Sequence, residues 1–563
     1  MTRNFLRIMR NKVLIIVFLA LCVPAGLMAR TVQLTLTQNG SDVTELLKKN
    51  AKGLTPSDTL SVVVNKGDYY LSGTVKINAS VMLSGKGRKK SRLVCVDNNN
   101  FTDDCYLHVS GLKGQPVAVM VKDLNLSLAH HDDFWWDRDH QHYLLKIYHA
   151  NHVDISNIES YMNNSTGTNL NMRVCSNVNI SNCKFTNYNN NRTGGILWIN
   201  GNTDNVTIKK NKFFKYGNDE TIALFGTSDD AYKWNGANVT SHKRNIEVVD
   251  NEFHFEPEGK DQEAVVMDVA FSIFSQEGKT RCVIPTALEN IRFSNNKIIV
   301  DCDVKDLFML RFEENTTHDG IAISDNEIEY TARSSQTNSS RVGVRCIDYT
   351  SQATPIDIER NTLVSRCVVV SKKWNNQTFL VVDGARVNVT NNTISTTTTD
   401  SELSSNKRVG TTLVWIRPRG GSATLTDNHC TGLYAIANLS DSDTIQAASL
   451  CATGNYFDGC TSILCGNIKR LDIDFSSNTF ESSKWEYFLV EFAKTGSIVF
   501  KDNTVNARNK GGALLCHYKK ENLSTILLDK LEITGNILNN VNRNDFLNNL
   551  TPNKNSRISS NLF

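Results

Sequence analysis

The chain has 563 residues, of which 61 are Lys or Arg and 58 are Asp or Glu, giving a formal net charge of +3. Hydrophobic residues make up 40% of the sequence and proline occurs only 8 times, which excludes an intrinsically disordered chain. Four of the cations (Arg3, Arg7, Arg10 and Lys12) lie in the first 29 residues, which hold no acid, so the remainder has 57 basic and 58 acidic residues. This balance offers no basic surface for binding nucleic acid or an anionic membrane.

Residues 1–29 have the pattern of a signal peptide for export. A basic start is followed by an apolar run over residues 13–23 and then by small residues. The apolar run is too short to span a bilayer, so we expect no transmembrane segment. A lipoprotein signal, with Cys22 as the lipidated residue, is the alternative. We therefore expect a secreted, periplasmic or cell-surface protein.

Residues 30–58 are predicted to form an N-terminal cap segment with one short helix. Asp42 at the N-cap, with Glu45 three residues later, is a variant of the capping box. Leu46 and Leu47 supply an apolar face, and Gly53 can end the helix. A helix at this point would cover the open end of the following domain, whose unpaired edge would otherwise invite aggregation.

One short phrase recurs through the rest of the chain. It reads apolar, any residue, apolar, two polar residues, Asn, any residue, apolar, as in the segment from Val206 to Phe213. Upstream, Cys183 takes the Asn position of a matching copy, and Leu124 and Ile158 mark two degenerate copies. The asparagines of the successive copies are Asn211, Asn251, Asn296, Asn326, Asn361, Asn392, Asn428, Asn455, Asn478, Asn503, Asn536 and Asn561.

The alternation of apolar and polar residues indicates that each copy is a short strand, a tight turn and a second short strand. The copies recur every 23 to 45 residues with no helical pattern between them, so each coil is expected to stack in parallel on its predecessor. The repeated Asn is expected to tolerate left-handed backbone geometry. We also expect its side-chain amide to bond to the Asn one coil away, which would form an internal ladder.

The strand, glycine turn and strand at the start of this region, from Val62 to Leu71 and from Val75 to Gly87, fit the same pattern. Together with the repeats they resemble the right-handed parallel β-helix of the pectate lyase and polygalacturonase superfamily. The resemblance implies an all-β fold, a single-stranded right-handed parallel β-helix over residues 59–563 with the short N-terminal helix as its cap. It also implies a polysaccharide groove along one stacked sheet. An array of separate β-sandwich domains is the alternative, but no linker favours it.

The chain has 14 cysteines, 13 of them after the expected signal peptide. Their odd number and irregular spacing do not form a disulfide framework, and no pair has zinc-site spacing. We expect most of them to be small buried residues of the core. A bridge between Cys95 and Cys105 is an open alternative.

Each coil should contribute one strand to the sheet that lines the groove, with alternate side chains pointing inward and outward. The tall coils span 124–158 and 211–296, which places the expected site in the N-terminal half. The parity of each strand is not fixed by the sequence. The candidate outward row contains Arg173, Trp198, Asp268, Arg311, Arg345 and either Trp415 or Arg417. Asp268 is predicted to be catalytic, and the others are predicted to bind the substrate.

The densest cluster of polar and aromatic residues runs from His130 to His142 and leads onto the strand at Tyr143. Trp135 and Trp136 could stack on sugar rings, and His130 could hold hydroxyl groups. The alternative is a loop packed on the flank of the coils. No spacing selects a metal, so we predict no metal ligand; a Ca²⁺ requirement is possible but no motif supports it.

Asn202-Thr203-Asp204, followed by Asp219 and Glu220, is similar to the carboxylate pairs of the polygalacturonases. The similarity implies that Asp219 and Glu220 are catalytic, one as general acid and one as base for water, with Asp268 as a further carboxylate. The Gly-His-Gly and Arg-Ile-Lys motifs of that family are missing from this sequence. A polar loop end is the alternative.

A lyase is the second enzymatic possibility, because residues 220–228 resemble part of a strand motif of chondroitinase and alginate lyases of this fold. β-Elimination needs the uronate carboxylate neutralised, a task that Arg311, Arg345 and Arg417 could perform. The sequence thus predicts an exported protein, expected to be monomeric, that binds and cleaves a polysaccharide as a lyase or glycoside hydrolase. A non-catalytic glycan binder and a structural or adhesive rod remain alternatives, because one fold hosts all of them.

Overall fold

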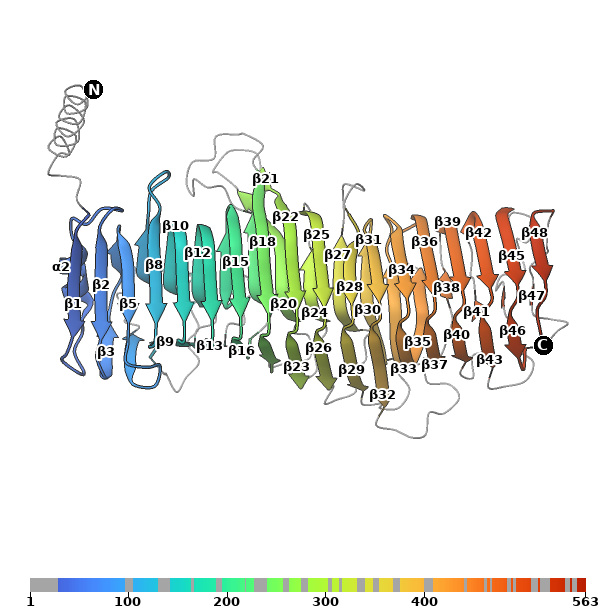
Figure 1. The fold of residues 1–563 in the computed structure, drawn as a ribbon, viewed down its shortest axis with the longest axis horizontal. Coiled ribbons are helices and arrows are strands. Elements are labelled where there is room, and N and C mark those ends of the chain that lie inside the picture. The colour runs from blue at the N-terminus through green and yellow to red at the C-terminus, as the bar shows by residue number, and fades with distance from the viewer. Residues whose placement is uncertain are drawn as a thin grey trace, which may run out of the picture.

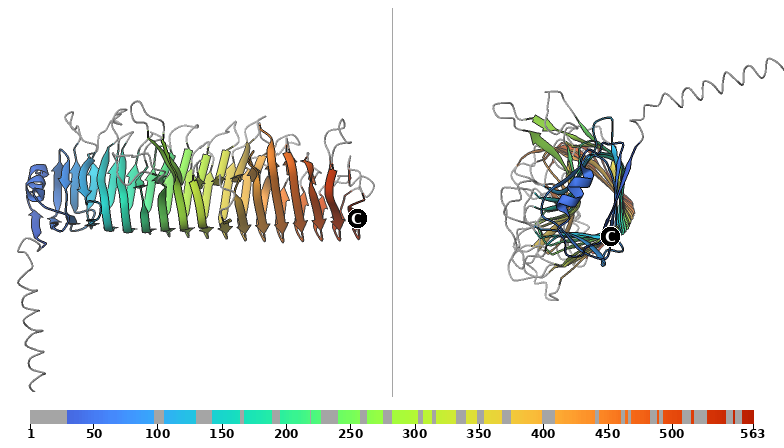
Figure 2. Two further views of the ribbon diagram at one scale, coloured as in Figure 1. Left: turned by 90° about the horizontal axis from the view of Figure 1, so that it is seen from above. Right: turned by 90° about the vertical axis from the view of Figure 1, so that its left-hand side faces the viewer.

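The computed structural model describes residues 29–563 with gaps at 97–104, 130–141, 164–166, 189–194, 218, 227–239, 257–262, 275–281, 302–305, 313–315, 332–339, 348–353, 368–374, 399–408, 440–442, 460–462, 466–467, 483–487, 490–492, 508–514, 517–526, 542–546 and 549–553. The described strands wind about one long axis and stack coil upon coil into a rod (Figure 1). Seen along that axis, the strands form the wall of a tube (Figure 2). The predicted fold class, a right-handed parallel β-helix with a short N-terminal helix, is confirmed.

Three faces of parallel strands run the length of the rod. Face A will carry the candidate site. Its strands are β4 (Val75–Ile77), β7 (Cys105–Ser110), the first halves of β10 (Tyr143–Ser156) and β12 (Thr168–Ser181), β14 (Leu197–Asn200), β17 (Asp219–Gly226), β20 (Glu263–Phe274), β24 (Asp306–Phe312), β27 (Ser340–Ile347), β30 (Asn375–Asp383), β33 (Val409–Ile416), the second half of β35 (His429–Leu439), β38 (Ile463–Cys465), β41 (Phe488–Leu489), β44 (Leu515–Cys516) and β47 (Leu547–Asn548). One short strand, β21 (Cys282–Ile284), pairs antiparallel with the end of β20.

Face B follows face A in each coil. It contains β1 (Thr31–Leu36), β2 (Thr59–Val64), β5 (Ser80–Ser84), β8 (Val117–Lys122), the second halves of β10 and β12, β15 (Thr203–Lys209), β18 (Ser241–Val249), β22 (Thr286–Ser294), β25 (Thr316–Ser324), β28 (Ile356–Glu359), β31 (Arg386–Thr390), β34 (Gly421–Thr426), β36 (Ile445–Thr453), β39 (Ile468–Ser476), β42 (Ala493–Lys501), β45 (Leu527–Thr534) and β48 (Ser556–Ser559). Since β1 pairs in parallel with β2, the cap segment already contributes a strand to the stack.

Face C completes the coil. It contains β3 (Gly67–Leu71), β6 (Ser91–Cys95), β9 (Asn125–Leu128), β11 (Glu159–Met162), β13 (Lys184–Asn187), β16 (Lys212–Lys215), β19 (Glu252–Phe255), β23 (Lys297–Asp301), β26 (Glu327–Thr331), β29 (Thr362–Cys367), β32 (Thr393–Thr398), the first half of β35, β37 (Tyr456–Gly459), β40 (Thr479–Ser482), β43 (Thr504–Ala507) and β46 (Ile537–Asn539). The interior is apolar, and some of it stacks in register: the rings of Phe185, Phe213 and Phe253 on face C lie 4.8 to 5.4 Å apart from coil to coil. Phe293 of face B contacts the last of these rings at 6.4 Å.

The predicted asparagine ladder is present between faces B and C. Asn326 illustrates the pattern: its Oδ1 accepts the backbone N–H and the side-chain amide of Asn296, at 2.9 and 3.0 Å. Its own Nδ2 donates to Asn361 Oδ1 at 2.8 Å and to the Phe293 carbonyl at 3.0 Å. The same side-chain bonds join all twelve asparagines from Asn211 to Asn561, and the Cys183 N–H donates to Asn211 Oδ1.

The left-handed residue of each turn is not the asparagine, as the sequence suggested, but the residue before it. Lys210, Asp250 and Asp325 have φ values of 56°, 56° and 58°, whereas none of the ladder asparagines has a positive φ. The preceding residue reverses the chain direction, which leaves the Asn side chain aimed into the coil and buried. Asn is therefore required here for its amide rather than for its backbone tolerance.

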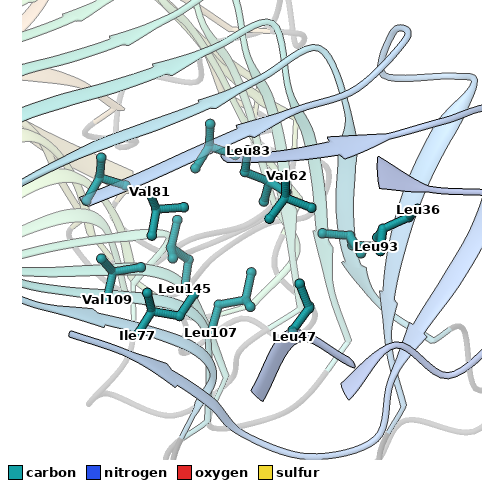
Figure 3. A pocket seen from close by; sticks show the side chains of 12 residues that line it. Leu36, Leu47, Val62, Ile77, Val81, Leu83, Leu93, Leu107, Val109 and Leu145 are labelled. Atoms are coloured by element: carbon teal, nitrogen blue, oxygen red, sulfur yellow. The ribbon is translucent and has the colours of Figure 1, made fainter. Parts of the chain in front are cut away.

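Helix α2 (Thr44–Ala51) closes the N-terminal end, as predicted, but its cap differs from the prediction. Val43 is the N-cap residue and makes no side-chain capping bond. Asp42 precedes the N-cap, and its Oδ1 accepts a hydrogen bond from the Thr44 N–H at 2.9 Å. Leu47 is buried, whereas Leu46 is exposed. Figure 3 shows Leu47 beside a small interior cavity lined only by Leu, Ile and Val side chains, which makes it part of the apolar core.

Five of the six cysteines whose side chains the structure describes are buried, whereas Cys451 is half-buried. Cys95 and Cys105 are both buried, and the bridge considered between them is absent. Burial raises the pKa of Cys175, Cys183 and Cys430 to about 12, which keeps these thiols protonated near neutral pH.

Replacing Asn326 by Ala should destabilise the protein by at least about 3 kcal/mol, because several buried donors and acceptors would lose their partners at once. The matched control is Asn388→Ala on the outer side of β31, where a half-buried amide donates one 2.9 Å bond to Asp357. Urea unfolding of the two variants checks this. Equal losses in the two variants would contradict the role given to the ladder.

Candidate functional site

The strand register of face A brings one residue of each coil to the same position on the outside of the rod. Leu145 and Ile147 of β10 belong to the core, so Lys146 between them points outward. The pairing then carries this position from coil to coil. This set, which we call the outer row, consists of Lys76, His108, Lys146, Asn171, Trp198, Ala223, Asp268, Arg311, Arg345, Val381, Trp415 and Asn438.

Most of the substrate-binding residues expected from the sequence fall on this face. Four of them share the outer row, namely Trp198, Arg311, Arg345 and Trp415, and the predicted catalytic residue Asp268 lies on it as well. Arg173 lies two residues after Asn171 on β12, on the same side of the strand. Arg417 directly follows the end of β33, and its guanidinium carbon lies 5.6 Å from the centroid of the Trp415 ring. His130, Trp135 and Trp136 lie outside the described residues.

Near the N-terminal end of the outer row, cations and aromatic rings gather around Tyr148. Lys146 Nζ lies 5.1 Å from the centroid of the Tyr148 ring, and the Arg173 guanidinium carbon lies 5.8 Å from it. The His108 ring meets the same ring edge-on, with centroids 5.1 Å apart. All four side chains come from three neighbouring strands, β7, β10 and β12.

Two further aromatic residues extend this group toward the next coils. Lys146 Nζ lies 5.2 Å from the centroid of the Tyr143 ring, and Tyr143 in turn contacts Trp198 with ring centroids 5.9 Å apart. We call the six residues His108, Tyr143, Lys146, Tyr148, Arg173 and Trp198 the cation–aromatic cluster.

The side chains of the cation–aromatic cluster are buried or half-buried, which restricts their positions. Lys146 is only 4% exposed although it points away from the core, and the rings of Tyr143 and Tyr148 provide the favourable environment that a buried ammonium needs. Next to it, Asn200 Nδ2 donates to Asn171 Oδ1 at 3.1 Å, and both amides are buried. Arg173, Tyr148 and Trp198 are half-buried, so part of each remains accessible.

Glu220, one of the predicted catalytic residues, lies on the coil after Trp198 and is only 1% exposed. The Glu220 side chain lies close to Gly195, which has no side chain of its own. A Cβ atom on Gly195 would lie 3.3 Å from Glu220 Cγ. Glu220 therefore packs against the coil that carries Trp198. Asp219 belongs to the same strand, β17, but its side chain is outside the described residues.

Asp268, the third predicted catalytic residue, is held in a buried ion pair. Arg311 Nε and one terminal nitrogen donate to the two oxygens of Asp268 at 2.9 and 2.8 Å, and its other terminal nitrogen donates to Glu263 at 2.7 Å. The side chains of Arg311 and Asp268 are 7% and 5% exposed. Asp268 therefore neutralises Arg311, and Arg311 is engaged by protein carboxylates.

Sequence reasoning missed five residues of this face: His108, Tyr143, Lys146, Tyr148 and Glu263. Tyr143 and Lys146 were recognised as parts of a groove strand, but their outward direction was not. His108 precedes Leu124, which marks the first copy of the repeat. Glu263 is connected to the outer row by its hydrogen bond from Arg311 on the next coil. The signal that would have found Lys146 is its place between two aliphatic residues of an otherwise apolar strand.

Neither metal ligation nor membrane spanning is indicated by the described residues. In that part of the chain no three His, Cys, Asp or Glu side chains converge as a metal site would require. No helix of those ranges is long and apolar enough to cross a membrane.

No family model and no curated protein matches the chain. Solved structures resemble it distantly: an exopolygalacturonase from Thermotoga maritima has 10% identity, a TM-score of 0.34 and coverage of 79% of this chain and 91% of its own. The catalytic domain of a GH87 α-1,3-glucanase in complex with nigerose has 9% identity, a TM-score of 0.30 and coverage of 90% and 69%. Tailspike protein 3 of bacteriophage CBA120 has 10% identity, a TM-score of 0.30 and coverage of 84% and 61%.

These likenesses are too distant to assign an activity. The fold rests on the strand pairing and the asparagine ladder of this chain, and its function has to be argued from the chemistry of face A.

Replacing Arg311 by Met should destabilise the protein by about 3–5 kcal/mol, because the buried carboxylate of Asp268 and the half-buried carboxylate of Glu263 would lose their cation. Arg470 is the matched control: it also joins two carboxylates, those of Asp472 and Asp529, but its side chain is 46% exposed. Arg470→Met should cause no measurable loss in urea unfolding. A comparable loss in both variants would refute the structural role of the buried pair.

Proposed function

We propose that this protein binds an acidic polysaccharide along face A and cleaves it by β-elimination at the cation–aromatic cluster. The observation that carries the proposal is that the buried ammonium of Lys146 and the half-buried guanidinium of Arg173 both contact the Tyr148 ring, at 5.1 and 5.8 Å from its centroid. Two fixed cations suit the carboxylate of a uronic acid, and the adjoining Trp198 suits the apolar face of a sugar ring.

The cluster contains the groups that elimination needs. In the proposed reaction Lys146 and Arg173 neutralise the substrate carboxylate, which makes the proton on the adjacent carbon easier to remove. In this proposal the His108 imidazole, which contacts the Tyr148 ring, is the general base that accepts that proton. The electron pair forms the C4–C5 double bond, the bond from C4 to the glycosidic oxygen breaks, and the Tyr148 hydroxyl donates a proton to the leaving oxygen.

A glycoside hydrolase is the second candidate, favoured by Glu220 on the coil next to Trp198. Hydrolysis requires a second working carboxylate, and Asp219 on the same strand is the one to test. Asp268 and Glu263 are less suited to that role, because both are bound to Arg311. Export through the N-terminal segment and a monomeric state remain part of the proposal.

Incubation of the mature chain with polygalacturonate, alginate, chondroitin sulfate, hyaluronan and neutral glucans separates these activities. The proposal expects unsaturated products that absorb in the near ultraviolet from an acidic glycan. New reducing ends without that absorbance would establish the hydrolase instead. Retention of a glycan without any product would establish a binder.

Lys146→Ala and Tyr148→Phe should each lower the rate of elimination by about 10²-fold or more, since each removes a group acting on the transition state. Arg244→Ala is the control, because Arg244 pairs with Glu289 on face B, away from the cluster. Full activity of Lys146→Ala in a correctly folded protein would refute the proposed site.

A further inference from the structure

The outer row carries a second pairing of a tryptophan with an arginine far from the cation–aromatic cluster. Trp415 of β33 lies on the row, and the Arg417 guanidinium carbon lies 5.6 Å from the centroid of its ring. Both side chains are half-buried, which holds them in place and leaves part of each accessible.

The backbone around this pair is fixed by its own bonds. The Arg417 N–H donates to the Val382 carbonyl at 2.8 Å, and the Arg419 N–H donates to Asp383 Oδ1 at 3.0 Å. Arg419 also pairs with the same carboxylate through its guanidinium, at 3.3 Å. The turn after β33 is therefore a rigid support for Trp415 and Arg417.

The distance between the two tryptophans follows from the register. From Trp198 the row passes through Ala223, Asp268, Arg311, Arg345 and Val381 before it reaches Trp415, which makes six steps from coil to coil. At about 4.8 Å per step the two rings are about 29 Å apart along the axis of the rod. Only an extended chain of several sugars can reach both.

The positions between them expose little negative charge. Ala223 and Val381 are small or aliphatic, and Arg345 is a cation. The carboxylates of Asp268 and Glu263 share the one guanidinium of Arg311, which leaves a net charge of −1, but the three side chains are only 5 to 17% exposed. An acidic glycan lying along the row from Trp198 therefore passes one largely buried acidic group before it reaches Arg417.

We infer that Trp415 and Arg417 form a second glycan contact, so that one long acidic chain binds the cation–aromatic cluster and this pair together. The inference rests on the proposed function. Once the chain is held at the cluster, contact with Trp415 becomes intramolecular, and the affinity rises when the chain is long enough to span both positions. The protein would thus favour polymer over short oligomers.

The test measures the affinity of the full chain for oligomers of the acidic glycan that it binds, from disaccharide to polymer. Trp415→Ala should lower affinity for the polymer by about 10²-fold and leave that for the shortest oligomers unchanged. Trp415→Phe, which keeps an aromatic ring, should retain most of the polymer affinity. Trp198→Ala should weaken binding at every length.

Two results would overturn the inference: an unchanged polymer affinity in Trp415→Ala, or an equal loss for short and long chains. Arg417→Gln provides a second variant if Trp415→Ala does not fold, and it should show the same dependence on length. If the wild-type chain binds no acidic glycan at all, the proposed function itself fails. Binding with length dependence but without unsaturated products would support the second contact and refute only the elimination.

Discussion

The structure depends on the bonds between asparagines of successive coils. From Asn211 to Asn561 each amide bonds to the side chain and backbone of its neighbours in the interior, which holds these coils in register. A slip of one residue would turn the outward side chains of a strand into the core. The outer row exists only because the register holds from β4 to β35. The ladder supports the later part of this row, whereas the strands of the cation–aromatic cluster precede Asn211 and are held by their own strand pairing.

Two parts of face A differ in what their cations contact. Around Tyr148 the cations Lys146 and Arg173 lie against aromatic rings. At Arg311 the cation is instead bound by two protein carboxylates. The described contacts of Lys146 and Arg173 are with aromatic rings, which add no negative charge, whereas those of Arg311 are with two carboxylates. This contrast is why the proposed chemistry is placed at Tyr148 rather than at Asp268.

The repeat pattern was sufficient to predict the fold, because period-two alternation and a recurrent Asn reflect the same local physics in every coil. It also placed Trp198, Arg311 and Trp415 on one face. Assigning the left-handed position to the asparagine was wrong. The residue before each ladder asparagine has the positive φ and turns the chain, and the Asn side chain then points into the core.

The contacts within the candidate site could not be predicted in the same way. The approach of Lys146 to Tyr148 depends on strand parity, and those of His108 and Arg173 depend on which coils become neighbours. The pairing of Glu263 with Arg311 joins residues 48 positions apart in the sequence. Such separations vary with loop length, which the repeat pattern does not control.

The most direct test is a crystal structure of the Tyr148→Phe variant soaked with the acidic glycan that the protein binds. We expect density for an extended chain along face A, with a sugar carboxylate between Lys146 and Arg173. Well-ordered glycan on face B or face C, with face A empty, would contradict the account.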